Sequence, residues 1–270
     1  MCLYCYATAY IGRRKSTPKK DLLLNVRKDL RVIDLDKPIN MSTSSDPYPP
    51  EEAELKLTQE VLKLLVNHGA KVLITTKSDL PVRDIDIITK GNVAVMITIT
   101  TLDDNLARKI EPNAPPPSQR LRAVQILAEN GVPVGVRIDP VIPCINDDEK
   151  MLRTLVKEVH AAGAKHIVTS TYKARPDNFK RIIEAFPELE KKLRHLYFEG
   201  GQYIHGYRYL NVETREKLLR PIVETARSLG LTYATCREGL GGDYRNAPSC
   251  DGSHLIPVRI GKMTRVLDLF

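Results

Sequence analysis

Residues 71–98 read KVLITTKSDLPVRDIDIITKGNVAVMIT and contain the structural unit that the rest of the chain repeats. Lys71–Thr76 and Val93–Thr98 are short apolar runs rich in β-branched residues, which is typical of buried strands. Val82–Lys90, between them, is predicted to form a short helix. A strand, a helix and a second strand in this order predict a parallel pair joined by a right-handed crossover.

The same alternation continues on both sides of this unit. Further strands are predicted over Pro38–Ser44, Val132–Val141, Lys165–Thr171 and Leu231–Thr235. Longer helices are predicted over Glu51–His68, Ser118–Asn130, Asp147–Ala162 and Asn211–Gly230. Strands that alternate with helices indicate an α/β fold with a parallel sheet. Too few units are present for a closed eight-stranded barrel, so we expect a partial barrel of the (β/α)6 type over residues 1–175. Residues 176–270 are expected to form a mostly helical extension with a Cys- and Gly-rich tail.

Composition limits the class of protein. The chain has 270 residues, a formal net charge of +8 and 42% hydrophobic residues, which indicates a globular protein. No run of about 18 uncharged apolar residues is present, and the N-terminus lacks the apolar region of a signal peptide. The five cysteines are an odd number without an export signal. We therefore expect a cytoplasmic protein whose close cysteines bind metal or do redox work.

The N-terminal sequence Cys2-Leu3-Tyr4-Cys5-Tyr6-Ala7 carries the strongest motif. A C-x-x-C pair alone is compatible with zinc, a redox pair or no function. The aromatic residue before Cys5 and the Tyr-Ala after it resemble the end of the C-x3-C-x-aromatic-C motif of radical S-adenosylmethionine (SAM) enzymes. In that family three thiolates hold a [4Fe–4S] cluster, and SAM binds the open iron and is cleaved to a 5′-deoxyadenosyl radical.

Four further segments resemble the spore-photoproduct-lyase-like group of this superfamily, in the same order along the chain. They are residues 44–51 (SSDPYPPE), residues 75–78 (TTKS) with Arg83-Asp84, residues 98–101 (TITT) with 111–115 (EPNAP) and Arg120-Leu121, and residues 139–143 (DPVIP) with Asn146-Asp147. All follow predicted strands, at the ends where barrel enzymes place their chemistry.

The resemblance implies roles for individual residues. Cys2 and Cys5 would be cluster ligands, and Tyr4 and Tyr6 would pack beside the cluster and the adenosine. Ser45, Lys77 and Thr98 would bind SAM, with the Lys77 ammonium pairing with its carboxylate. Core packing, capping or solvation would explain the same residues without a cofactor. The motif's first cysteine would stand four residues before Cys2, so we expect an N-terminal piece with that cysteine and the first strand to lie upstream.

Several other positions leave more than one interpretation open. Asp46, Glu111 and Arg120 suit either a pocket or a structural ion pair. Thr43 stands where spore photoproduct lyase has its hydrogen-donating cysteine, and a threonine O–H is a poorer hydrogen-atom donor than a thiol. We therefore expect little repair of spore photoproduct. Cys236, Cys250 and His254 in the tail could bind zinc, help bind a second cluster, or remain free thiols and a structural histidine.

The resemblance implies a radical SAM enzyme with lyase-like or other radical chemistry and an electron donor such as ferredoxin or flavodoxin. The basic segment Arg13–Arg31 and the family favour DNA or RNA as substrate. A non-catalytic nucleic-acid-binding or assembly protein on a degenerate scaffold is the alternative, and a zinc protein using the C-terminal cysteines is a third reading.

Overall fold

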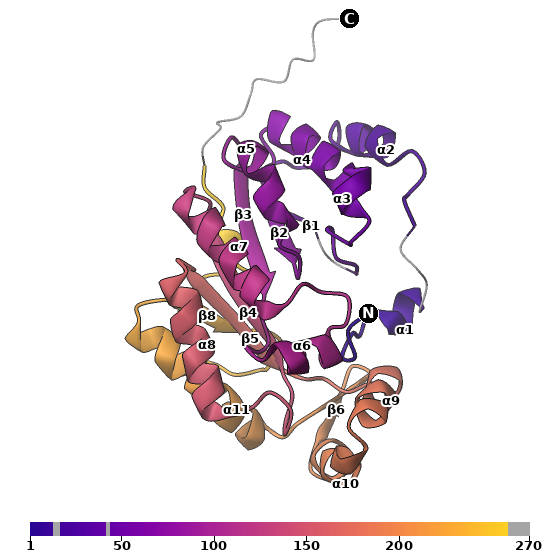
Figure 1. The fold of residues 1–270 in the computed structure, drawn as a ribbon, viewed down its shortest axis with the longest axis vertical. Coiled ribbons are helices and arrows are strands. Elements are labelled where there is room, and N and C mark those ends of the chain that lie inside the picture. The colour runs from indigo at the N-terminus through magenta and orange to yellow at the C-terminus, as the bar shows by residue number, and fades with distance from the viewer. Residues whose placement is uncertain (13–16, 42–43, 259–270) are drawn as a thin grey trace, which may run out of the picture.

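Six parallel strands form one sheet in the computed structural model, which describes residues 1–12, 17–41 and 44–258 (Figure 1). The strand order is β1-β2-β3-β4-β5-β8, and each strand pairs in parallel with the next. The bounds are β1 (Ile39–Met41), β2 (Lys71–Thr76), β3 (Asn92–Thr98), β4 (Val134–Val141), β5 (His166–Thr171) and β8 (Thr232–Thr235). The predicted α/β class and partial barrel of parallel strands are confirmed.

Helices run between successive strands, and Figure 1 shows α4, α5, α7 and α8 along the outer side of the sheet. The helices are α1 (Thr8–Ile11), α2 (Leu22–Asp29), α3 (Glu52–Leu55), α4 (Leu57–Asn67), α5 (Ile85–Ile88), α6 (Asp104–Ile110), α7 (Pro117–Glu129), α8 (Glu149–Ala161), α9 (Pro176–Ala185), α10 (Glu190–Arg194) and α11 (Val212–Ser228). Side-chain caps begin several of them. The Asp148 carboxylate, for example, accepts a hydrogen bond from the Met151 N–H at the start of α8.

Alternate residues of each strand face two different cores. In β2, Val72 and Ile74 belong to the large core beneath the outer helices, whereas Leu73 belongs to a small inner core. The inner core also contains Met96 of β3, and the C-terminal segment at Gly252 packs against it. Gly252 has φ +93°, and a Cβ there would collide with the Met96 sulfur, so only glycine fits.

The single helix predicted over Glu51–His68 is wrong, because the structure divides it into α3 and α4. Lys56, between them, adopts a left-handed conformation with φ +52°. The Glu52 carboxylate accepts the N–H groups of Thr58 at 2.9 Å and Gln59 at 3.2 Å. A buried acid therefore caps α4, and this contact outweighs the tendency of the sequence to continue as one helix.

The C-terminal third is less purely helical than expected. The strands β6 (Gln202–Ile204) and β7 (Tyr207–Tyr209) form an antiparallel hairpin. β8 pairs with β5 and so extends the main sheet, while α11 packs on α8 and β5. The division of the chain at residue 175 stays a prediction.

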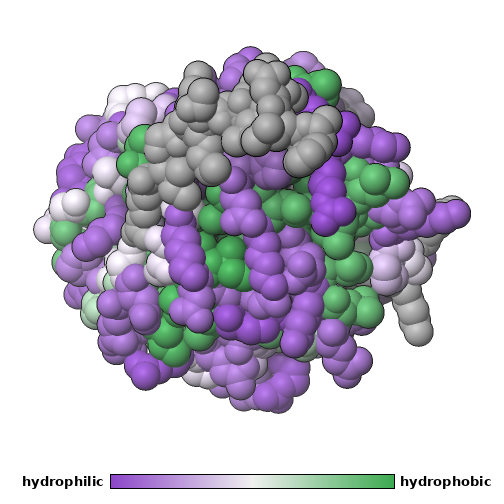
Figure 2. All heavy atoms as spheres, turned by 90° about the horizontal axis from the view of Figure 1, so that it is seen from above, coloured by the Kyte–Doolittle hydropathy of each residue, from purple (hydrophilic) through white to green (hydrophobic). Residues whose placement is uncertain are grey.

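The surface is largely polar. Figure 2 shows one face on which hydrophilic residues predominate and apolar residues form small separate patches. Within the described residues, no helix is both long and apolar enough to cross a membrane.

Candidate functional site

The Cys2–Cys5 loop lies at the carboxyl ends of the strands, next to the end of α6 (Figure 1). The Leu3 N–H donates to the Ile110 carbonyl at 2.9 Å, and the Cys5 N–H donates to the Cys2 carbonyl at 3.2 Å. Both thiols are half-buried and unbridged. The loop thus presents its two sulfur atoms at the end of the barrel where the family motif would place them.

Lys77 follows β2 and reaches this loop. Its Nζ lies 5.6 Å from the centre of the Tyr4 ring. Burial would lower the Lys77 pKa, but nearby acidic groups, with Cys2 and Glu111 foremost, raise it above the ordinary 10.5. The pKa of Cys2 is raised chiefly by burial, while Lys77 opposes that rise. The structure therefore brings Cys2, Tyr4 and Lys77 together, and Lys77 carries its charge into a partly enclosed site.

A buried ion pair between Arg120 and Glu111 contacts the Tyr4 side chain. Arg120 Nη1 lies 2.7 Å from Glu111 Oε2, with both side chains almost wholly enclosed. The Tyr4 hydroxyl donates to the Glu111 carboxylate, which also accepts from Thr100 at 3.1 Å. Arg120 also donates to the Thr98 carbonyl at 2.8 Å. These contacts favour the structural reading of Glu111 and Arg120, because both hold the Tyr4 side chain and the end of β3.

Asp46 likewise acts on the chain around it. Its carboxylate accepts from the Tyr48 N–H at 3.0 Å, the Thr76 hydroxyl at 2.5 Å and the Lys77 N–H at 2.8 Å. Asp46 therefore ties the loop after β1 to the end of β2 and fixes the backbone from which Lys77 projects.

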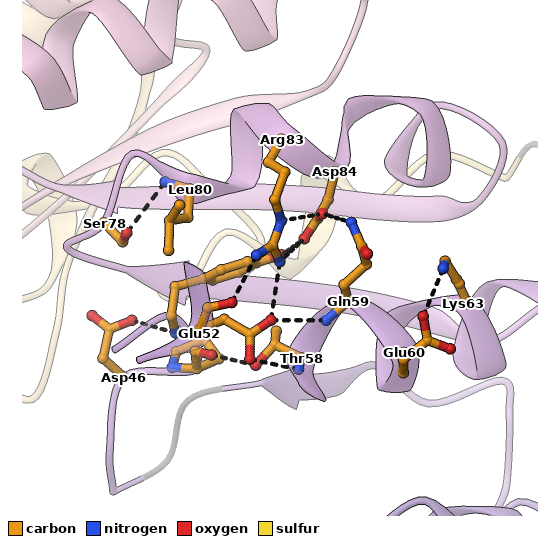
Figure 3. A network of polar contacts seen from close by, with 12 residues as sticks. Asp46, Glu52, Thr58, Gln59, Glu60, Lys63, Ser78, Leu80, Arg83 and Asp84 are labelled. Atoms are coloured by element: carbon orange, nitrogen blue, oxygen red, sulfur yellow. Dashed lines mark hydrogen bonds and ion pairs between the residues drawn. The ribbon is translucent and has the colours of Figure 1, made fainter. Parts of the chain in front are cut away.

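A second polar network anchors the far side of the same loop (Figure 3). Arg83 pairs with Glu52 at 3.0 Å and with Asp84 at 2.8 Å. Asp84 also accepts from Gln59 at 2.5 Å and from the Tyr48 hydroxyl at 3.0 Å. The network joins α3, α4 and the turn after β2, so it holds Tyr48 and Glu52 against the segment that follows Lys77.

The remaining predicted SAM residues make no hydrogen bond to the Cys2 group within the described part of the chain. Ser45 is exposed and lines a cavity of about 400 Å³ between residues 17–22, β1 and α3. Thr98 is buried at the end of β3. Within the described residues, no hydrogen bond joins either hydroxyl to Cys2 or Lys77. Tyr6 points outward, with its ring centre 6.3 Å from that of Tyr207. Thr43 lies outside the described residues, and the roles assigned to the others stay predictions.

The thiol Cys236 directly follows β8, the edge strand of the sheet. Its N–H donates to the Thr169 carbonyl at 2.9 Å, and burial, followed by the charge of Asp139, raises its thiol pKa to about 11. His254 packs edge-on against His166, with ring centres 4.6 Å apart. In residues 1–12, 17–41 and 44–258, no group of three or more histidine, cysteine or acidic side chains could hold a metal ion. The zinc reading of Cys236, Cys250 and His254 therefore gains no support.

Cys2 and Cys5 can be compared with the ligand set that a [4Fe–4S] cluster requires. Cys2 and Cys5 are soft thiol donors on one short loop beside a cation, which suits an iron–sulfur cluster. They match two of the three thiolate ligands that the resemblance implies, so the residues fit the cluster in part.

Sequence reasoning missed an aromatic–arginine rim beside this loop, formed by Tyr6, Tyr10, Arg175, Tyr207 and Arg237. The Arg175 guanidinium carbon lies 4.9 Å from the Tyr10 ring centre and 4.8 Å from that of Tyr207. Arg237 lies 4.9 Å from the same Tyr207 ring. The signal in the sequence was the stretch at residues 203–209, which contains three tyrosines and one arginine, but its partners are far away along the chain.

Solved structures resemble this fold. Spore photoproduct lyase, as a double mutant with bound SAM and dinucleoside spore photoproduct, matches with a TM-score of 0.65 and 17% identity over 86% of this chain and 72% of that chain. SuiB of Streptococcus suis bound to SAM matches with a TM-score of 0.55 and 13% identity over 87% of this chain and 47% of that chain. These likenesses show the fold.

Sequence relatives are uncharacterised proteins. One from Methanocaldococcus jannaschii is 35% identical over 156 residues, which are 56% of this chain and 60% of the relative. One from Mycobacterium tuberculosis is 26% identical over 229 residues, which are 82% of this chain and 63% of the relative. The chain thus spans about three fifths of the length of the curated relatives it matches. The profile of the Radical SAM superfamily matches residues 1–156, more than half of the chain. The protein therefore belongs to the radical SAM superfamily.

Proposed function

We propose that the protein is a radical SAM enzyme in which Cys2 and Cys5 supply two thiolates to a [4Fe–4S] cluster. The observation that carries this proposal is the convergence of Cys2, Tyr4 and Lys77 at the carboxyl end of the parallel sheet. The chemistry that the bound cluster and SAM supply is reductive cleavage of a C–S bond, which yields a 5′-deoxyadenosyl radical. A small electron-transfer protein such as ferredoxin or flavodoxin would be the reductant.

The chain's own residues would bind and orient SAM. Lys77 would donate a charge-assisted hydrogen bond to its carboxylate, because its ammonium is held beside the cysteine loop. Tyr4 would form an aromatic wall, since its hydroxyl is fixed by Glu111. Ser45 and Thr98 would contact the amino acid part and the ribose, as the family resemblance implies.

Nucleic acid is the substrate class that we propose. The aromatic–arginine rim supports it, because exposed rings stack on bases while arginines attract phosphates. The structural neighbour spore photoproduct lyase binds a dinucleoside lesion, which is consistent with this substrate class. The basic helix α2, with Arg27 and Lys28 in its last turn, adds positive charge at the N-terminal end of the chain.

Anaerobic reconstitution tests the central proposal. A form of the protein extended upstream of Met1 to include a cysteine four residues before Cys2 should bind about four irons per chain. Cys2→Ala and Cys5→Ala should abolish iron binding, whereas the control Cys144→Ala, in a loop after β4, should not. The extended protein should then convert SAM slowly to 5′-deoxyadenosine in the presence of reductant. Binding of zinc and no iron would refute the proposal.

A further inference from the structure

Side chains of helix α9 donate hydrogen bonds to the backbone of the cysteine loop. Arg181 Nε donates to the Leu3 carbonyl at 2.9 Å, and Arg181 Nη2 donates to the Cys5 carbonyl at 2.6 Å. Asn178 Nδ2 donates to the Tyr4 carbonyl at 3.2 Å. Three consecutive carbonyl groups of the loop therefore accept hydrogen bonds from side chains on one face of α9.

The Arg181 guanidinium is itself held in place. Its residue is only 7% exposed, and Nη1 lies 3.3 Å from the Asp177 carboxylate one helical turn earlier. Nη2 also donates to the Thr8 hydroxyl at 3.2 Å, and that hydroxyl donates to Asp177 at 2.6 Å. A planar guanidinium presents its N–H donors in a rigid fork that spans the two carbonyls, whereas a lysine ammonium is a compact donor on a flexible stem.

The contact between Arg181 and the cysteine loop joins two distant parts of the sequence. The N-terminal loop and α9 are about 175 residues apart, and α9 belongs to the segment after β5. On the barrel side, the Leu3 N–H donates to the Ile110 carbonyl at the end of α6, and the Tyr4 hydroxyl donates to Glu111. The side chains of α9 therefore bind the Leu3, Tyr4 and Cys5 carbonyls of the loop, while the barrel side binds the Leu3 N–H and the Tyr4 hydroxyl.

We propose that Arg181 is a positioning residue for the cluster, which shapes the Cys2–Cys5 loop for ligation and places a positive charge beside it. This inference rests on the proposed function. A fixed cation near an iron–sulfur cluster favours the reduced form, because reduction adds negative charge. Arg181 would therefore both hold the loop at the Leu3 and Cys5 carbonyls and raise the cluster's reduction potential.

Thiol labelling of the chain without cluster tests the positioning role. Arg181→Met removes two hydrogen bonds from a charged donor to the loop carbonyls, so the loop should open more often and expose the Cys5 thiol. Alkylation of Cys5 should therefore be at least about tenfold faster, because one such bond contributes about 1.5–3 kcal/mol. Lys180→Met is the matched control, since it removes a charge from the neighbouring residue, whose side chain is 71% exposed. Cys144 gives an internal reference for labelling. Equal Cys5 rates in Arg181→Met and wild type, with both proteins folded by circular dichroism, would overturn the positioning role.

The reduction potential tests the charge. In the reconstituted extended protein, Arg181→Met should shift the cluster midpoint to a more negative potential. Arg181→Lys should restore the potential while Cys5 stays fast to label, because lysine keeps the charge and loses the rigid fork of donors. A merely structural residue would not give this split, and an unchanged midpoint in Arg181→Met would overturn the charge role.

The two proposals fail in different ways. If the extended wild type binds no iron, the proposed function fails, and labelling alone still decides whether Arg181 fixes the loop. If iron binds normally but Arg181→Met changes neither labelling nor potential, the inference about Arg181 fails and the proposed function stands.

Discussion

Arg120 Nη1 lies 2.7 Å from Glu111 Oε2, and the two side chains are 1% and 0% exposed. Glu111 also accepts the Tyr4 hydroxyl, so the pair connects α7 in the barrel wall to the cysteine loop. Such a pair adds little net stability compared with an apolar core, but it fixes one arrangement of the groups around it. Removal of one partner leaves the other charged, buried and unpaired.

Arg120→Met should therefore destabilise the protein by about 3–5 kcal/mol, because Glu111 would be stranded in the core. Urea denaturation gives the free energy of unfolding. Lys63→Met is the control: its ion pair with Glu60 has both side chains about half exposed, and its loss should cost less than about 1 kcal/mol. A similar small change for both variants would contradict the buried-pair argument.

Lys77→Ala should weaken SAM binding by about 1.5–3 kcal/mol, because it removes one charge-assisted hydrogen bond. Isothermal titration of the reconstituted extended protein measures the affinity. Lys90→Ala, an exposed lysine after α5, controls for the change in net charge. An unchanged affinity in Lys77→Ala would remove this residue from the SAM site without affecting the family assignment.

The strands and most long helices could be predicted from sequence because their signals are local. Lys71–Thr76 and its counterparts are β-branched runs, and glycine or a capping side chain marks helix ends. The break at Lys56 could not be predicted in this way, because it depends on Glu52 turning back to cap α4.

The candidate site likewise contains some residues that the sequence predicts and others that only the structure reveals. Cys2 and Lys77 stand in recognisable motifs, and the structure brings them together. Arg181 carries no motif, and its partners are 178 and 176 residues away in sequence. Periodicity places Arg181 on a helix face, but only the packing of α9 on the N-terminus shows what it contacts.

The lowered pKa of His166 predicts that the folded protein loses stability in acid. Burial, aided by the charge of His254, lowers its pKa from 6.5 to about 3. The unfolded chain therefore binds a proton that the folded chain rejects, so the stability present above pH 6.5 is lost as the pH falls toward 3. The free energy of unfolding should fall by about 2–3 kcal/mol between pH 6.5 and 4.5 from this group. His166→Gln should lose visibly less over the same interval in urea titrations, and equal losses in both proteins would contradict the shifted pKa.

Nucleic-acid binding should depend on the aromatic–arginine rim, and two tyrosines allow a matched comparison. Tyr10 and Tyr203 are both 66% exposed. Tyr10 belongs to the rim, where Arg175 donates to its hydroxyl at 2.7 Å. Tyr203 stacks on Arg208, the neighbour of Tyr207 in β7, and successive residues of a strand point to opposite faces. Tyr203 therefore lies on the face of the hairpin away from the rim.

Tyr10→Ala should weaken binding of a single-stranded oligonucleotide by about 1–3 kcal/mol, the value of one base stacked on a ring, without changing the salt dependence. Arg237→Ala should instead lower the slope of log affinity against log salt by about 0.7, because one phosphate contact is lost. Tyr203→Ala and the exposed Arg122→Ala on α7 should bind as the wild type does. Fluorescence anisotropy over a range of salt concentrations measures both quantities. If Tyr203→Ala weakens binding as much as Tyr10→Ala, the contact lies over the whole hairpin rather than the rim. Undetectable or salt-insensitive binding by the wild type would reject nucleic acid as the substrate class, and the rim would then serve a different aromatic or anionic ligand.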